Sequence, residues 1–227
     1  MKALLIKGVV SFALLTSVAV APVGAALIDR GSFNDGFGGT MHLIYDTDLH
    51  ITWLGDADFA QTSGFAFDGL MDWTTATGWA SGLTVGGYTD WRLPTTTQPD
   101  LSCGAQVLLG FPDQGFGFGC TGSEMGHLYN VEGITAAAPG LLFDNVQALF
   151  YWSGTEFAPN PDRAWYIDFR PGYQYFIVKD NPFFAWAVRD GDVSAPPIPE
   201  PSTIILLGSG LVGLIGWQRA RRRLMIR

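Results

Sequence analysis

The sequence predicts an α+β domain in which early helices pack on a late antiparallel sheet. Core-forming side chains recur at helical spacing between residues 70 and 83, at Leu70, Trp73, Thr77, Ala80 and Leu83. The last third of the chain is instead dense in short apolar runs separated by turn residues such as Pro171-Gly172. Because short links join neighbouring strands, these runs indicate an antiparallel meander on which the helices pack.

The first half of the domain begins with a predicted hairpin. Strands are expected at 43–45 and 51–53, on either side of a turn at 46–48 that contains two aspartates. The helix at 70–83 follows, with Asp68 as its expected N-cap and Gly82 or Gly86 near its end. The next segment, 86–95, reads as a turn followed by an extended chain, because Pro94 disfavours helix in the residue before it.

The second half begins with a shorter helix that Thr121 or Ser123 can cap, running through Met125, Leu128 and Tyr129. Strands are then expected at 149–153, 164–169, 173–178 and 184–189. Residues 133–140 and 194–198 lack a periodic pattern and are expected to form loops, the second of them a linker.

Residues 1–26 have the layout of a secretory signal peptide. Lys2 and Lys7 precede an apolar run at 8–20, and small residues follow it. Cleavage there would start the mature protein near Ala26 or Leu27. A retained membrane anchor is the alternative, but the apolar run is short for that role.

The C-terminal end has three features in a fixed order. The triplet Pro199-Glu200-Pro201 precedes an apolar segment at 202–217. Five arginines follow it: Arg219, Arg221, Arg222, Arg223 and Arg227. The apolar segment is slightly shorter than the roughly 17–25 residues of a typical membrane-spanning helix, and the arginines would stay cytoplasmic.

The region 199–227 therefore resembles the PEP-CTERM sorting signal of Gram-negative bacteria. The resemblance implies a single transmembrane helix at 202–217 and recognition by an exosortase after passage through the secretion machinery. It also implies a transient stay in the inner membrane, followed by transfer to the cell envelope or extracellular matrix. An ordinary C-terminal anchor that is never cleaved is the alternative.

Residues 27–193 remain as one domain of about 170 residues, long enough for a substantial core. Six basic and twenty acidic residues lie between the two ends, which gives this domain a net charge near −14. Such a charge disfavours nucleic acid as a partner and keeps an exported protein soluble. Cys103 and Cys120 are the only cysteines, and in an exported protein they are expected to form a disulfide.

The domain resembles the DUF1566 family, also called the Lcl C-terminal domain type, from about Leu43 to Asp192. Four motifs carry this resemblance in order: Asp46 to Trp53, Gly87 to Thr95, Tyr151 to Thr155 and Trp186 to Arg189. It implies a C-type-lectin-like fold and a kinship with surface adhesins that bind glycosaminoglycan-like polymers. The loop 99–122, which contains both cysteines, departs from the family pattern.

The family has no agreed set of catalytic residues, so the resemblance assigns no catalytic role to the residues that match its motifs. These residues are Trp91, Arg92, Leu93, Pro94, Trp152, Trp186 and Arg189. The expected role of the tryptophans is to form core, and that of Arg92 and Arg189 is to pair with acids. No nucleophile or metal-binding histidine pattern is present, so the protein is predicted not to be an enzyme and to need no cofactor.

Two groups of residues are candidate binding sites. Two Asp-x-Asp pairs offer oxygen ligands for calcium: Asp46 with Asp48, and Asp56 with Asp58. Aromatic residues crowd the late strands, and those on the outer face, with Tyr173 and Tyr175 as candidates, can stack on sugar rings. The predicted function is thus polysaccharide binding at the surface; a structural, self-associating protein or an unrecognised hydrolase are the alternatives.

Overall fold

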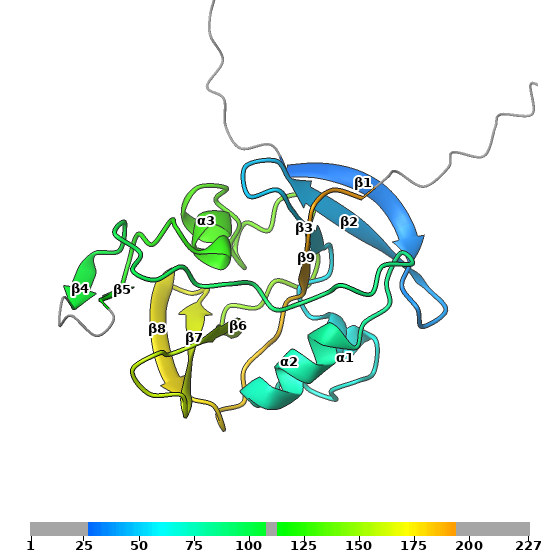
Figure 1. The fold of residues 1–227 in the computed structure, drawn as a ribbon. Helices are drawn as coiled ribbons and strands as arrows, with labels where there is room; N and C mark the ends of the chain where they lie inside the picture. Colours follow the sequence, from blue (N-terminus) through cyan, green and yellow to red (C-terminus); the bar gives the residue numbers. More distant parts are fainter. Residues whose placement is uncertain (1–26, 108–112, 194–227) are drawn as a thin grey trace, which may run out of the picture.

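The computed structural model describes residues 27–107 and 113–193, where β-strands in three small sheets are the main regular secondary structure (Figure 1). The largest sheet has the order β1-β2-β3-β9. Its strands are β1 (Leu27–Asn34), β2 (Thr40–Asp46), β3 (Ile51–Leu54) and β9 (Val188–Asp190). All three of its strand pairs are antiparallel.

The hairpin of β2 and β3 forms where the sequence predicts it. Tyr45 pairs with Thr52 across the two strands. In the turn, Oδ1 of Asp46 accepts the backbone N–H groups of Asp48 and Leu49, each at 3.0 Å. An aspartate that binds the backbone two and three residues ahead stabilises a tight turn locally, which is why this hairpin is legible in the sequence.

A second sheet is the meander β6-β7-β8, from β6 (Phe150–Glu156), β7 (Arg163–Asp168) and β8 (Tyr173–Val178). These strands agree with three of the four late strands expected. The third sheet pairs only β4 (Ala105–Val107) and β5 (Gln114–Phe116) within the cysteine loop. It projects from the body of the molecule beside β8 (Figure 1).

The helices are short: α1 (Phe59–Thr62), α2 (Trp73–Ser81) and α3 (Glu124–Asn130). The N-cap of α2 is Asp72, whose carboxylate accepts the N–H of Thr75 at 2.8 Å. The expectation of Asp68 as the cap is wrong, because its side chain binds the N–H of Leu70 in the preceding turn. Gly82 ends the helix as expected.

The α+β expectation, with a C-type-lectin-like arrangement of early helices on a late sheet, is also wrong. The chain enters the fold through three strands, and the longest helix has only nine residues. The segment expected as the fourth strand of the late meander instead ends in β9 and pairs with β3 of the first sheet. Strands from the beginning and the end of the domain therefore lie in the same sheet, and the fold is mainly β.

The core lies where the segment leading to β9 passes between the two larger sheets. The N–H of Trp152 on β6 binds the carbonyl of Phe184, and the N–H of Leu54 after β3 binds that of Ala187. Trp186, fully buried in this segment, lies edge to face with Trp53 at a centroid distance of 5.3 Å. Its indole N–H reaches the Leu54 carbonyl at 2.8 Å, so the large ring is buried without losing a hydrogen bond.

Candidate functional site

Four aromatic rings form a continuous row on the surface where β5 meets β8. Phe118 lies 4.9 Å from Tyr173, Tyr173 lies 5.9 Å from Tyr175, and Tyr175 lies 5.4 Å from Phe116, measured between ring centroids. We call this row the aromatic strip. Phe116, Tyr173 and Tyr175 are half-buried and Phe118 is 57% exposed, so the rings are supported from below and open to solvent.

Alternation along β8 explains why its two tyrosines share one face. Gln174, between them, points the other way and is only 2% exposed. Its side-chain amide lies against Cys103 Sγ at 3.7 Å and the Gly115 carbonyl at 3.4 Å. The residue that separates the two tyrosines therefore ties β8 to the cysteine loop.

The predicted disulfide between Cys103 and Cys120 is confirmed. It closes the loop that contains Phe116 and Phe118. Two backbone hydrogen bonds of 2.9 Å join Gly117 to Gln174 and hold the loop beside β8. Gly117 has a φ of +102°, a conformation that side chains rarely adopt, so glycine lets the strand turn between the two phenylalanines. Disulfide and glycine together place the loop's rings next to the strand's rings.

The neighbouring strand adds a further tyrosine. Tyr166 on β7 pairs with Tyr175 on β8. Burial raises the pKa of Tyr166, and the charge of Asp168 adds to that increase. The hydroxyl therefore stays protonated and able to donate a hydrogen bond across the physiological range. A row of partly exposed rings beside a tyrosine hydroxyl combines apolar and hydrogen-bonding contacts.

The four aspartates proposed as calcium ligands do not come together. Asp46 and Asp48 lie at the β2–β3 turn. Asp56 follows β3 at the other end of the hairpin, where the strand register places it opposite Met41. Met41 is five residues before Asp46 along β2, a distance of about 16 Å at about 3.3 Å per residue. The two pairs thus belong to different surroundings.

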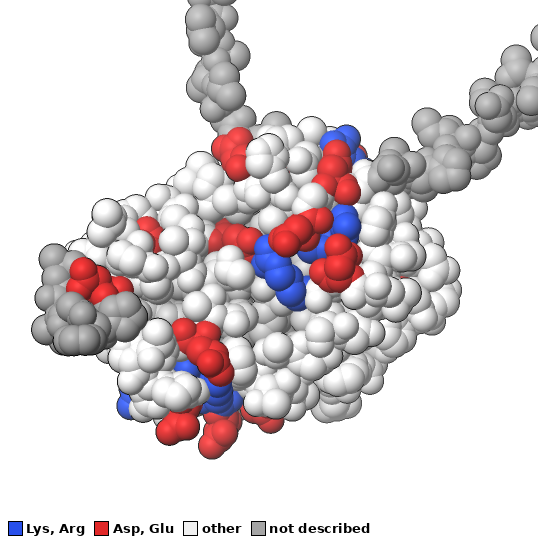
Figure 2. Space-filling view, viewed as in Figure 1, with Lys and Arg blue, Asp and Glu red and all other residues white. Residues whose placement is uncertain are grey.

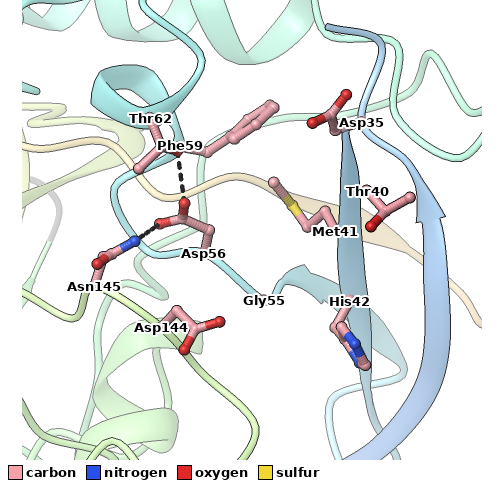
Figure 3. Close-up of a pocket in the computed structure, with 10 residues that line it drawn as sticks. All are labelled: Asp35, Thr40, Met41, His42, Gly55, Asp56, Phe59, Thr62, Asp144 and Asn145. Carbon is pink, nitrogen blue, oxygen red and sulfur yellow. Dashed lines mark hydrogen bonds between the residues drawn. The ribbon is translucent and has the colours of Figure 1, made fainter. Parts of the chain in front are cut away.

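Asp56 lines a surface pocket of about 340 Å³ between β2, α1 and the segment at 144–145 (Figure 3). Asp35 and Asp144 add two further carboxylates to it. Asp56 is already engaged: its carboxylate accepts the Thr62 hydroxyl at 2.6 Å and the Asn145 amide at 3.1 Å, as Figure 3 shows. The pocket's central acid therefore fixes the loops around it.

Asp58 is buried beside this pocket, and burial raises its pKa to about 6, with the charge of Asp56 as the next cause. The backbone N–H of Gln61 opposes that increase. Asp58 is thus a buried acid whose charged form the fold disfavours, and it does not belong to the group of side chains gathered around Asp46.

The motif arginines form ion pairs with acids on one face. Arg92 binds Glu124 through two hydrogen bonds of 2.8 and 2.7 Å and also reaches Asp190. Arg189 makes a two-point contact with Asp90 at 2.8 and 2.9 Å. Figure 2 shows basic side chains on this face flanked by acidic ones, so the face presents no basic patch for nucleic acid.

The other motif residues help to hold the fold together. Trp91, Leu93 and Trp152 are buried, as is Trp186. The carbonyl of Pro94 accepts the N–H of Gly154 at 2.8 Å and the hydroxyl of Ser153 at 2.9 Å. The four motif segments therefore meet in the core, although they are far apart in the sequence.

Comparison with known proteins gives one match, at the C-terminal end, where Pro199-Glu200-Pro201, the apolar segment and the arginines follow in order. Residues 197–223 match the PEP-CTERM protein-sorting motif. No curated protein and no solved structure matches the chain. The resemblance of the domain to DUF1566 has no counterpart in these comparisons and stays a prediction.

The PEP-CTERM motif shows that the chain is an exported protein with a C-terminal sorting signal for exosortase processing, in keeping with a location at the cell surface. The motif lies outside the described residues, as do the signal peptide expected at 1–26, the linker expected at 194–198 and the helix expected at 202–217. Within 27–107 and 113–193, no helix has the length and apolar character needed to cross a membrane.

The sequence pattern indicates only half of the aromatic strip. Strand alternation points to Tyr173 and Tyr175, whereas Phe116 and Phe118 lie in a glycine-rich segment without strand periodicity. The disulfide was the one available signal, because a closed loop must lie against some neighbouring element. Which element it contacts is a property of the tertiary structure.

Proposed function

We propose that residues 27–193 form a non-enzymatic binding domain that holds a polysaccharide of the cell envelope or matrix through the aromatic strip. The observation that carries the proposal is the unbroken row of four rings, each of them partly exposed to solvent. Sugar rings have apolar C–H faces that stack on aromatic rings, and a row of such rings suits a chain of sugars. A surface protein delivered by exosortase would meet such polymers where it is delivered.

The charge of the domain narrows the class of ligand. A net charge near −14 repels anionic polymers, so the proposed ligand is a neutral polysaccharide. The resemblance to DUF1566, with its adhesin relatives, supports adhesion in general. Its glycosaminoglycan-like ligands fit this acidic domain less well.

The test is binding of the purified full-length protein, in detergent, to neutral and acidic polysaccharide fractions from the host matrix. Tyr173→Ala and Tyr175→Ala are each expected to weaken binding to the neutral fraction by about tenfold, since an aromatic contact contributes about 0.5–1.5 kcal/mol beyond its buried area. Tyr175→Phe keeps the ring and should retain most of the affinity. Tyr45→Ala is the matched control, because Tyr45 is a half-buried tyrosine on the other large sheet.

Equal binding by wild type and the double variant Tyr173→Ala/Tyr175→Ala would contradict the proposal. Release of new reducing ends from the polysaccharide by pure protein would contradict its non-enzymatic part.

Self-association is the second candidate, because the surface also presents large apolar side chains away from the strip. Phe67 is 98% exposed and Leu141 is fully exposed. Such residues favour contact with another protein surface. A mass in solution that exceeds the monomer and falls on substitution of Phe67 or Leu141 by serine would support self-association.

A further inference from the structure

Three polar side chains from separate parts of the chain meet beneath the β2–β3 turn, apart from the aromatic strip. Asp46 ends β2, His127 lies in the last turn of α3, and Glu132 follows that helix. One ligand atom from each, a carboxylate oxygen or an imidazole nitrogen, lies within 4.8 Å of both others. We call these three residues the Asp-His-Glu cluster.

The chain folds locally so that all three point inward. Oδ1 of Asp46 accepts the turn N–H groups, which fixes the carboxylate with Oδ2 directed away from the turn. After α3 the N–H groups of Val131 and Glu132 both return to the His127 carbonyl, at 2.8 and 3.2 Å. This tight C-terminal turn brings the Glu132 side chain back over the imidazole of His127.

The inward atoms are buried and lack ordinary partners. Asp46 is fully buried, and the side chains of His127 and Glu132 are 13% and 7% exposed. Among the residues that the structure describes, Oδ2 of Asp46, Nε2 of His127 and Oε1 of Glu132 make no hydrogen bond. Buried polar atoms are nearly always hydrogen-bonded, so three of them facing one another need a common explanation.

The charges in the cluster favour a cation. Two carboxylates are buried around one imidazole, and the carboxylate of Asp48 lies at the edge, 45% exposed. Carboxylates gathered in the interior are unfavourable without a compensating positive charge.

The distances fit a metal better than hydrogen bonds. Nε2 of His127 lies 3.6 Å from Oε1 of Glu132 and 3.9 Å from Oδ2 of Asp48, both beyond hydrogen-bond range. Ligands about 2.0–2.1 Å from a tetrahedral zinc ion lie about 3.3–3.4 Å apart. The separation between His127 and Glu132 therefore needs only a small contraction, and the ligand atoms of all three residues already lie within 4.8 Å of one another.

We infer that Asp46, His127 and Glu132 bind one divalent transition-metal ion, with Zn²⁺ as the best match to their donors, and that the open side faces Asp48. Imidazole nitrogen together with carboxylate oxygen suits zinc, whereas calcium and magnesium take oxygen ligands. This assignment differs from the calcium set expected from the sequence, because it keeps Asp46 and replaces Asp56 and Asp58 by residues more than eighty positions away from Asp46 in the chain.

The ion would act as a cross-link in the exported domain. It would join the short helix α3 to the hairpin of the first sheet, two elements that the sequence separates widely. The partly exposed Asp48 gives the ion a route in from solvent. The inference does not depend on polysaccharide binding.

The test is calorimetric titration of the full-length protein in detergent, after removal of metal by a chelator, with Zn²⁺, Ca²⁺ and Mg²⁺ in turn. One Zn²⁺ per chain is expected to bind, and neither Ca²⁺ nor Mg²⁺ should compete at equal concentration. With zinc at a hundredfold excess over its Kd, the Tm should rise by about 5–10 °C. Glu132→Gln and His127→Ala should each weaken zinc binding at least tenfold.

The matched control is His42→Ala, since His42 is an exposed histidine whose Nδ1 lies 2.8 Å from an Asp29 carboxylate oxygen. Its substitution should leave zinc affinity unchanged. Absence of zinc binding at 100-micromolar concentration, or affinity unaffected by both cluster variants, would overturn the inference.

A measurement on wild-type protein covers the case in which a variant fails to fold. Bound Co²⁺ should produce paramagnetically shifted imidazole signals from a single histidine. Shifted signals from more than one histidine, or none, would also overturn it.

Discussion

Replacing Asp58 by asparagine is expected to stabilise the domain at neutral pH by about 2–3 kcal/mol. Asp58 is 2% exposed, and its Oδ1 makes no hydrogen bond within the described chain. Its Oδ2 has only a long contact of 3.4 Å with the Gln147 amide. Burial and the charge of Asp56 raise its pKa from 3.8 to about 6. The fold thus disfavours the charged form of this side chain.

The direction of the pH dependence follows from the raised pKa. Below pH 3.8 the carboxyl is protonated in both the folded and unfolded states and contributes nothing to the pH dependence. Between pH 3.8 and about 6 the folded state holds the proton more tightly, so the free energy of unfolding falls as pH rises. A difference of about two pKa units corresponds to about 3 kcal/mol, most of which is lost by pH 7. Asparagine is neutral at every pH and avoids this loss.

The assay is urea unfolding of wild type and Asp58→Asn at pH 4.5 and pH 7.5. The variant should exceed wild type at pH 7.5 and approach it at pH 4.5. Asp180→Asn is the control, because Asp180 is an exposed aspartate and its substitution should leave the pH dependence as in wild type. An Asp58→Asn protein no more stable than wild type at pH 7.5 would refute the reasoning about burial.

Two further predictions concern the loop and the ion pairs. Replacing Cys103 and Cys120 by serine should lower the free energy of unfolding by about 3 kcal/mol, since the bond closes a loop with a sequence separation of 17, and should weaken polysaccharide binding. Unchanged binding would show that the loop rings are dispensable. Glu124→Gln should cost about 2 kcal/mol, because Glu124 is 13% exposed and holds Arg92 through two hydrogen bonds. Glu156→Gln removes the ion pair between Glu156, which is 50% exposed, and Lys179, and this substitution should lower the free energy of unfolding by less than about 1 kcal/mol. Equal losses of stability for the two glutamine variants in urea unfolding would contradict this ranking.

The parts of the fold that could be predicted are those with local causes. The β2–β3 turn is stabilised by an aspartate within the turn itself, and β6, β7 and β8 are joined by short links. β1 is not apparent from the sequence, because LIDRGSFN shows no clean alternation and only one of its residues is buried. The sequence also does not indicate the sheet to which β9 belongs, because its partner strand is distant in the chain, with Arg189 opposite Thr52. Propensity alone cannot report such a pairing.

The same distinction applies to the sites. Strand alternation was enough to find Tyr173 and Tyr175. Their partner rings required the disulfide loop to lie against β8. His127 and Glu132 are five residues apart, which matches no helical metal-ligand spacing, and Asp46 is far from both in the chain. Only the folded chain brings them together, at the tight turn that ends α3.

The most direct test of the central claim, delivery to the cell surface by exosortase, is intact-mass analysis and fractionation of the native protein from hosts with and without that enzyme. With the enzyme, we predict loss of the residues beyond about Pro201 and recovery of the protein in the envelope or the medium. Without it, the full C-terminus should remain in the inner membrane. A full-length C-terminus held in the inner membrane of both hosts would contradict the account.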